Sequence, residues 1–289
     1  MSNSKQSDMS KLPTAYDNRD FFEANLLSFA LKSDKSTMEM PFFSLSTKPD
    51  LRTFNWTSRD GSRTIKIIPS VLGRATQMDK DILIYIISQL KFSENWKRKD
   101  SSRRVRFVVH HYLLATHKNT CGREYKRLEN ALQRIRGTTI TTNIKTNGVE
   151  FKQGFGLIES WETLKKSDSN PKMTAVEVVL SEWLWNAIQA HDVLTLNSSY
   201  FHIRSPLERK IYEISRKHTG YQSKWTIGID LLRIKTGSSA TPAKFRHMLC
   251  KIALSNKMPD YKMEINISKN QVDFYKKNVS KYIQAKLKK

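Results

Sequence analysis

The sequence has little cysteine and no long apolar run. Its 2 cysteines, Cys121 and Cys250, form no Cys-x-x-Cys pair, which argues against a disulfide scaffold and a zinc knuckle. No run of about 18 apolar residues occurs, so we expect no transmembrane helix. Residues 1–11 are polar and unlike a secretory signal. These absences predict a reduced, intracellular protein with no membrane partner.

Acidic residues are also scarce relative to basic ones. The chain has 50 Lys and Arg against 27 Asp and Glu, a net charge of +23 and a pI near 10.0. Such an excess favours polyanionic partners, either nucleic acid or an anionic membrane. With 38% hydrophobic residues and 289 residues in total, the chain can build real cores and is long enough for two domains.

Motifs for nucleotide or metal chemistry are missing as well. The sequence has no P-loop, no paired carboxylates and no glycine-rich phosphate cradle. We therefore expect no cofactor, no metal and no catalytic residues.

The stretch from Val105 to Trp161 contains the main functional signals. A short strand at 105–109 and a short helix at 110–116 precede a break at 118–122, and a basic helix follows at 123–136. Gly137 occupies a plausible C′ position, which would end that helix in a left-handed conformation. One stripe of the basic helix is apolar, formed by Tyr125, Leu128, Leu132 and Ile135. Off this stripe lie the candidate DNA-binding residues Arg123, Lys126, Arg127, Asn130 and Arg134.

A hairpin signal follows the basic helix. Residues 138–144 and 149–158 alternate at period 2 around Asn147-Gly148, the pair that a type I′ turn favours. The tip carries the candidate phosphate contacts Lys145, Asn147 and Lys152. Helix, turn, basic helix and two-stranded ribbon is the order of a winged helix-turn-helix. The alternative interpretation is a helix and hairpin with a solvated basic face.

Weaker signals flank this stretch. We expect strands at 40–45, 54–56, 64–69 and 176–180, a polar loop at 162–172, and a boundary segment at 191–200. Thr76 to Asp79 has capping-box spacing and opens a helix with a core face of Ile82, Leu83, Ile86, Ile87 and Leu90.

The same order recurs near 205–276. Ser205, Pro206 and Glu208 have N-cap, N1 and N3 spacing and open a helix. A strand at 225–227, a short helix at 230–235, a basic helix opened by Thr241-Pro242 and a hairpin at 261–274 follow. The candidate DNA-binding residues here are Lys244, Arg246, His247, Lys251 and Lys269. We therefore expect an α+β protein of two tandem winged-helix domains, with a flexible tail at 1–37, a first domain at 38–195 and a second at 196–289 that ends in a basic tail.

With both halves described, the sequence resembles the plasmid replication initiator protein A family from about Met40 to the last hairpin. The segments that carry the resemblance are Met40 to Leu45, Gly73 to Thr76 with Asp79 and Asp81, Gly122 to Leu128, Trp161, Leu180 to Leu184, Tyr200-Phe201, Pro206 to Arg209, Arg216 to His218 and Phe245-Arg246. The resemblance implies a cytoplasmic, plasmid-associated bacterial initiator that is not an enzyme. It would bind repeated double-stranded origin sites, help to melt the origin and recruit the host initiator and helicase machinery, and it could repress its own gene as a homodimer.

Three alternatives remain open. A transcriptional repressor needs the same two modules. A rolling-circle nicking initiator needs a His-x-His cluster and a tyrosine nucleophile; the sequence has no His-x-His, and Tyr112 and Tyr125 fit core positions. A membrane-surface protein needs its basic residues on one amphipathic helix, and here they are spread over several elements.

Overall fold

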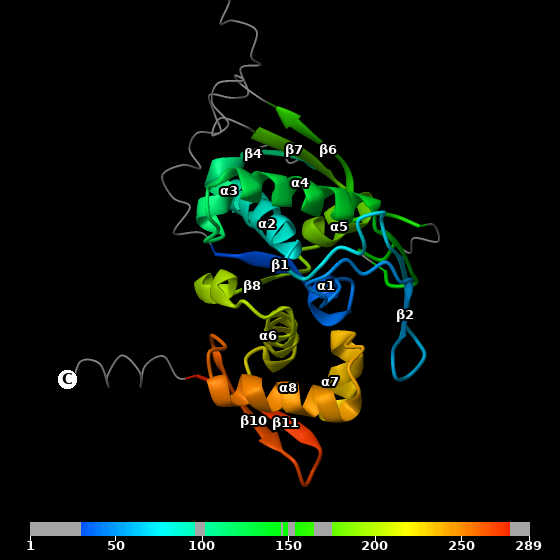
Figure 1. Ribbon diagram of the computed structural model, residues 1–289, viewed down its shortest axis with the longest axis vertical. Helices are drawn as coiled ribbons and strands as arrows, with labels where there is room; N and C mark the ends of the chain where they lie inside the picture. Colours follow the sequence, from blue (N-terminus) through cyan, green and yellow to red (C-terminus); the bar gives the residue numbers. More distant parts are fainter. Residues whose placement is uncertain (1–29, 96–101, 146, 150–153, 165–174, 278–289) are drawn as a thin grey trace, which may run out of the picture.

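Helices and antiparallel strands alternate along the chain in the computed structural model, which describes residues 30–95, 102–145, 147–149, 154–164 and 175–277 (Figure 1). The expected α+β class is therefore confirmed. No helix of the described residues is long and apolar enough to span a membrane.

Among the described residues, the core of the first half is built from two three-stranded antiparallel sheets and the helices that pack on them. One sheet has the order β2 (Phe54–Thr57), β3 (Thr64–Ile68), β5 (Thr139–Thr142), and the other has the order β4 (Arg104–Val108), β7 (Ala175–Leu180), β6 (Ile158–Leu164). The helices are α2 (Lys80–Asn95), α3 (Val109–Ala115), α4 (Gly122–Gly137) and α5 (Glu182–Gln189). Their apolar faces form one core that runs from Met40 to Ile188.

Helix α2 is buried on more than the one face that its sequence pattern predicts. The five core residues expected from the periodicity are all buried, and so are Ile84 and Tyr85 between them. Ile84 belongs to the core of the second half, whereas its neighbours belong to the core of the first. Because two cores meet across α2, this helix joins the halves.

The second half has the order helix, strand, helix, helix and hairpin that the sequence predicts. After η5 (Ser198–His202) come α6 (Pro206–Thr219), β9 (Lys224–Gly228), α7 (Ile229–Thr236), α8 (Pro242–Ser255), β10 (Tyr261–Asn266) and β11 (Gln271–Lys276). The sheet order is β10-β11-β9. Ser205 and Thr241 each accept a hydrogen bond from the third residue of their helix, and proline follows both caps, as their spacing predicts.

The predicted flexible tail is wrong for residues 30–37. The strand β1 (Lys32–Asp34) pairs with β8 (Val193–Thr195), and α1 (Lys35–Glu39) follows directly. Ser33, Asp34 and Thr37 are fully buried. Asp34 caps α1 by accepting a hydrogen bond from the Thr37 amide, so a polar stretch that resembles a tail is held by local capping and by strand pairing. Residues 1–29 lie outside the described part.

The predicted hairpin after α4 is supported where the structure describes it. Ile140 and Phe155 exchange two backbone hydrogen bonds, at 2.8 and 2.9 Å, and form an antiparallel bridge whose register centres on Asn147-Gly148. These two residues have the positive φ angles, 50° and 76°, that a type I′ turn requires. Residues 146 and 150–153 lie outside the described part. In addition to the predicted hairpin, β5 pairs with β3, and β6 pairs with β7 from Ile158 onward.

Three smaller predictions of local structure were wrong. Residues 162–164 belong to β6, although they were expected to be loop, and 40–45 form no strand beyond a bridge from Ser44 to Thr76. Gly137 has no left-handed φ: it ends α4, and Thr138 is the C-cap. A Cβ on Gly137 would lie 2.7 Å from Cβ of Ser70, so the close approach of that loop requires glycine.

Candidate nucleic-acid interface

Helix α4 presents a basic face to solvent. Leu128, Leu132 and Ile135 are buried beneath it. Of the predicted DNA-binding residues, Arg123, Lys126 and Arg127 are exposed and Asn130 is partly exposed. Two acidic neighbours on the same helix pair with this face. Lys126 lies 2.9 Å from Glu129, and Arg127 pairs with Glu124 at an i,i+3 spacing. The pair of Lys126 and Glu129 is exposed and contributes little to stability, whereas the Glu124 side chain that pairs with Arg127 is only 11% exposed.

Arg134, the fifth residue predicted on this helix, has a structural contact. Its Nε and Nη2 donate to both carboxylate oxygens of Asp79 at 2.8 and 2.7 Å. Asp79 also accepts from the Thr76 amide at 2.8 Å, while its own amide donates to the Thr76 hydroxyl at 3.2 Å. The capping box that the sequence predicts is therefore present, and Arg134 ties α4 to it. We therefore leave Arg134 out of the base-reading set proposed below, and its contact with DNA stays a prediction.

Helix α8 presents a second basic face. Phe245 and Leu249 are fully buried, whereas Lys244, Arg246, His247 and Lys251 are all exposed. Arg246 donates to Asn270 in the turn between β10 and β11 at 3.2 Å, and Lys269 beside it is exposed. The hairpin tip therefore lies against the basic face of α8.

The other predicted contacts are more scattered. Lys145 and Asn147 are exposed near the turn after β5. Lys152 lies outside the described residues, as do the basic loop at 96–101 and the lysines after residue 277. Their contribution stays a prediction.

Two adjoining hollows connect the basic faces of α4 and α8. One, of about 1240 Å³, is lined by Lys244, Met248 and Lys251 of α8. The other, of about 560 Å³, is lined by Glu124, Arg127 and Arg134 of α4. Ser46 and Arg204 line both hollows, so the two hollows adjoin, and together they form the depression that α4 and α8 border.

The depression is strongly basic. The first hollow is lined by six lysines and arginines and by two carboxylates. The second is lined by five lysines and arginines and by two carboxylates. Arg204 is counted in both. Each of the two carboxylates in the second hollow is paired, Asp79 with Arg134 and Glu124 with Arg127. A concave surface lined mostly by positive charges concentrates the electrostatic field and attracts a polyanion.

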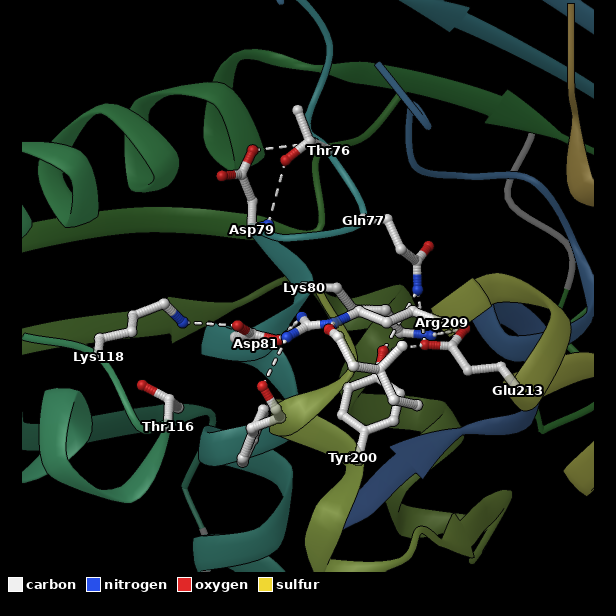
Figure 2. A network of polar contacts seen from close by, with 12 residues as sticks. Thr76, Gln77, Asp79, Lys80, Asp81, Thr116, Lys118, Tyr200, Arg209 and Glu213 are labelled. Atoms are coloured by element: carbon white, nitrogen blue, oxygen red, sulfur yellow. Dashed lines mark hydrogen bonds and ion pairs between the residues drawn. The ribbon is translucent and has the colours of Figure 1, made fainter. Parts of the chain in front are cut away.

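A buried polar network fixes how the two halves sit against each other (Figure 2). Asp81 of α2 pairs with Arg209 of α6, whose side chain is 1% exposed, and also with Lys118 at 2.5 Å. Since Lys118 lies in the turn between α3 and α4, one carboxylate connects that turn to the second half. Arg209 completes its hydrogen bonds on the carbonyls of Ile203 and Phe201.

A second buried carboxylate repeats this arrangement. Glu213 of α6 accepts from Lys80 at 2.8 Å, from Gln77 at 2.7 Å and from the Tyr200 hydroxyl at 2.6 Å. Burial and the charge of Glu213 raise the pKa of Tyr200, so its hydroxyl stays a donor. Because these buried charges are all paired, separating the halves would expose or orphan several of them.

The amine of Lys210 anchors α1 to α6. It donates to the carbonyls of Thr37, Met38 and Met40 at 2.6–3.0 Å. Burial lowers the pKa of Lys210 to about 7. The sequence shows these polar residues, but nothing in its periodicity marks them as buried partners.

The two tyrosines considered for nicking chemistry lie in structural positions. The described residues contain no group of three His, Cys, Asp or Glu that could hold a metal ion. Tyr112 is 3% exposed, and burial raises its pKa to about 12, which disfavours a nucleophilic phenolate. Tyr125 is partly buried against the first core.

Comparison with known proteins identifies the family. The model of the family described as Replication initiator protein A matches residues 32–263. The chain belongs to this family. It is also 34% identical over 262 residues to a protein of Wigglesworthia glossinidia brevipalpis named "Putative replication protein", covering 90% of this chain and 94% of that one. The family match begins at β1, where the described fold begins.

Solved structures show a similar fold. Two crystal structures of domains 2 and 3 of RctB superpose with TM-scores of 0.59 and 0.53 at 11% and 12% identity. The matches cover 84% and 85% of this chain and 98% and 97% of those chains. At this level of identity the likeness concerns the fold alone. It spans both halves, so the two-part arrangement recurs in another protein.

Proposed function

We propose that this replication initiator binds repeated double-stranded sites in a plasmid origin by placing α4 and α8 in successive major grooves. The observation that carries the proposal is the shared wall of the two basic hollows. Because Ser46 and Arg204 line both, α4 and α8 border one depression and can face one duplex. Two helices that read the same face of B-DNA lie about 34–36 Å, or roughly 10–10.5 bp, apart.

The second half supports a winged-helix interpretation most directly. Its order α6-β9-α7-α8-β10-β11, with a sheet in which β11 lies between β10 and β9, is that of a winged helix. The first half has the helix–turn–helix part in α3 and α4, but its strands are divided between two sheets. We interpret it as a winged helix modified by insertion of β6 and β7.

The contacts divide into two chemical roles. We assign base reading to exposed side chains of the two helices, where Arg and Lys can donate to guanine and Asn can pair with adenine. These are Arg123, Lys126, Arg127 and Asn130 on α4, and Lys244, Arg246, His247 and Lys251 on α8. Lys145, Asn147 and Lys269 lie in turns and suit phosphate contact.

Origin melting and recruitment extend this proposal. A binder that prefers bent or untwisted duplex can help to melt an adjacent A·T-rich region without an active site, since bending a site costs on the order of 1–6 kcal/mol. We therefore propose a non-enzymatic initiator that recruits the host initiator and helicase, and that also forms homodimers. A repressor without initiator activity would bind the same DNA; it would leave replication of the cognate origin intact when the gene is deleted.

The test is footprinting on DNA that flanks the gene, followed by affinity measurements on the protected duplex and on a random duplex. Arg127→Ala should weaken specific binding by about 1–3 kcal/mol and relax one base position. Arg136→Ala is the matched control, because Arg136 is exposed on the same helix nine residues later, on the opposite side. Equal losses on both duplexes, or an equal effect of Arg136→Ala, would remove α4 from the reading role.

A further inference from the structure

The wall shared by the two hollows carries an arginine that pairs with no carboxylate of the described residues. Arg204 lies between η5 and α6 and is exposed. It lines both hollows, the one bordered by α4 and the one bordered by α8. His202, two residues earlier, is also exposed and lines the larger hollow.

His117 of the first half lines the smaller hollow together with Arg204. It follows α3 and has a left-handed φ of 53°. Its amide donates to Leu114 and the Lys118 amide donates to Leu113, which makes a Schellman ending with His117 at C′. Glycine takes this position at no steric cost, whereas a side chain here costs about 1–2 kcal/mol. A non-glycine residue held in this backbone conformation beside a hollow is a candidate for a functional side chain.

The two histidines lie together, and the charge of Arg204 acts on one of them. The rings of His117 and His202 have centroids 4.2 Å apart at an interplanar angle of 32°. Burial, and then the charges of His202 and Arg204, lower the pKa of His117. No described residue forms a hydrogen bond with either ring, so three cationic or protonatable groups converge here without an acceptor.

We propose that His117, His202 and Arg204 form a phosphate-binding site that holds the DNA backbone between the major-groove contacts of α4 and α8. This inference rests on the proposed function. When two helices enter successive major grooves on one face, the minor groove and its two backbones face the protein between them. A phosphodiester oxygen would supply the acceptor that the three side chains lack, as charge-assisted hydrogen bonds to phosphate require.

Binding at this site should be linked to protons. Without a ligand the pKa of His117 is lowered by burial and by neighbouring positive charge, and a phosphate would favour its imidazolium form, so DNA should bind more tightly as the pH falls from about 8 to about 6. The other charged groups that face the hollows are Lys48, Asp50, Arg52, Arg74, Asp79, Lys118, Glu124, Arg127, Arg134, Glu208, Lys244, Lys251 and Lys257. Comparing the pH dependence with and without the two imidazoles isolates their contribution from that of these groups.

The experiment uses the full chain, the duplex protected in footprinting and a random duplex of equal length. Three proteins are compared with the wild type: Arg204→Ala, the double variant His117→Asn with His202→Asn, and the control His191→Asn. Asn tolerates the left-handed conformation, so the turn after α3 is kept. His191 has the same C′ conformation after α5, with φ 55°, but its Nδ1 lies 3.1 Å from Lys91 and it lines neither hollow.

Arg204→Ala should weaken binding to both duplexes by about tenfold and reduce the log–log salt slope by about 0.9. A neutral methylphosphonate at the central backbone of the protected duplex should abolish the difference between Arg204→Ala and the wild type. The double histidine variant should bind like the wild type at about pH 8 and lose most of the tightening toward pH 6, while His191→Asn keeps it.

Three results would overturn the phosphate site: unchanged affinity for Arg204→Ala, a methylphosphonate duplex that leaves the difference intact, or equal pH dependence in all proteins. Each presupposes that wild-type protein binds the protected duplex. Absence of that binding would instead refute the proposed function, so the two failures are distinguishable.

Discussion

Replacing Asp81 by asparagine should destabilise the protein more than any other single loss of charge considered above. Asp81 accepts from Arg209 and from Lys118, and its side chain is 1% exposed. The variant leaves the guanidinium of Arg209, also 1% exposed, without a counterion between α2 and α6.

The magnitude follows from burial. Removing one partner of a buried ion pair costs about 3–5 kcal/mol, because the remaining charge stays desolvated. Total stabilities are about 5–15 kcal/mol, so Asp81→Asn should remove a large fraction. The exposed pair between Lys35 and Asp192, with side chains 38% and 46% exposed, gives the matched control. Asp192→Asn should cost at most about 1 kcal/mol.

Urea unfolding followed by tryptophan fluorescence measures both variants. A second variant, Asp81→Asn with Arg209→Met, separates an orphaned charge from a general loss of packing, because an apolar side chain of similar length removes the unpaired charge. It should recover most of the lost stability. A loss below about 1 kcal/mol for Asp81→Asn, or no recovery in the double variant, would refute the view that this network holds the halves together.

Two further predictions concern Arg134 and His218. Arg134→Ala should lower the free energy of unfolding by about 1.5–3 kcal/mol, because it breaks the two hydrogen bonds with Asp79, and it should change the ratio of specific to random DNA affinity less than Arg127→Ala does. Lost specificity at unchanged stability would return Arg134 to the reading set. Burial, and then the charge of Lys235, lower the pKa of His218 to about 4, so its protonation favours the unfolded chain. Stability should therefore fall as the pH drops from about 6.5 towards 4, and His218→Gln should flatten this decline. In the folded protein Glu39 stays ionised throughout that window, since its hydrogen bonds with Lys217 and Lys235 outweigh burial and lower its pKa to about 2; its protonation in the unfolded chain, with a pKa of 4.5, adds to the decline only near the lower end of the window. A wild-type unfolding curve that is flat across the window would contradict the assignment.

The elements that the sequence predicts well are those with local signals. Ser205-Pro206 and Thr241-Pro242 mark the starts of α6 and α8, and the alternation after Tyr261 marks the hairpin. Leu128, Leu132 and Ile135 of the predicted stripe of α4 are buried, and Tyr125 is partly buried. Each of these signals depends on neighbours within about one or two turns of chain.

The features that could not be predicted depend on distant partners. β4 pairs with β7, which lies some seventy residues later, and β5 pairs with β3, which lies some seventy residues earlier. Arg134 lies on the polar side of α4 as expected, but Asp79, 55 residues earlier, occupies its guanidinium. Arg204 lies in no recognisable motif. Its proposed role in phosphate binding depends on its position in the lining of both hollows.

The most direct test of the account is affinity cleavage from the two helices. An iron–EDTA tether on Cys121, exposed at the N-cap of α4, is compared with one on Ser239→Cys, exposed before α8, with the other cysteines replaced by serine. The account predicts that the two tethers cut the same duplex on one face at positions roughly 10–10.5 bp apart. Cleavage on opposite faces, or from one tether alone, would contradict a single duplex held by both α4 and α8.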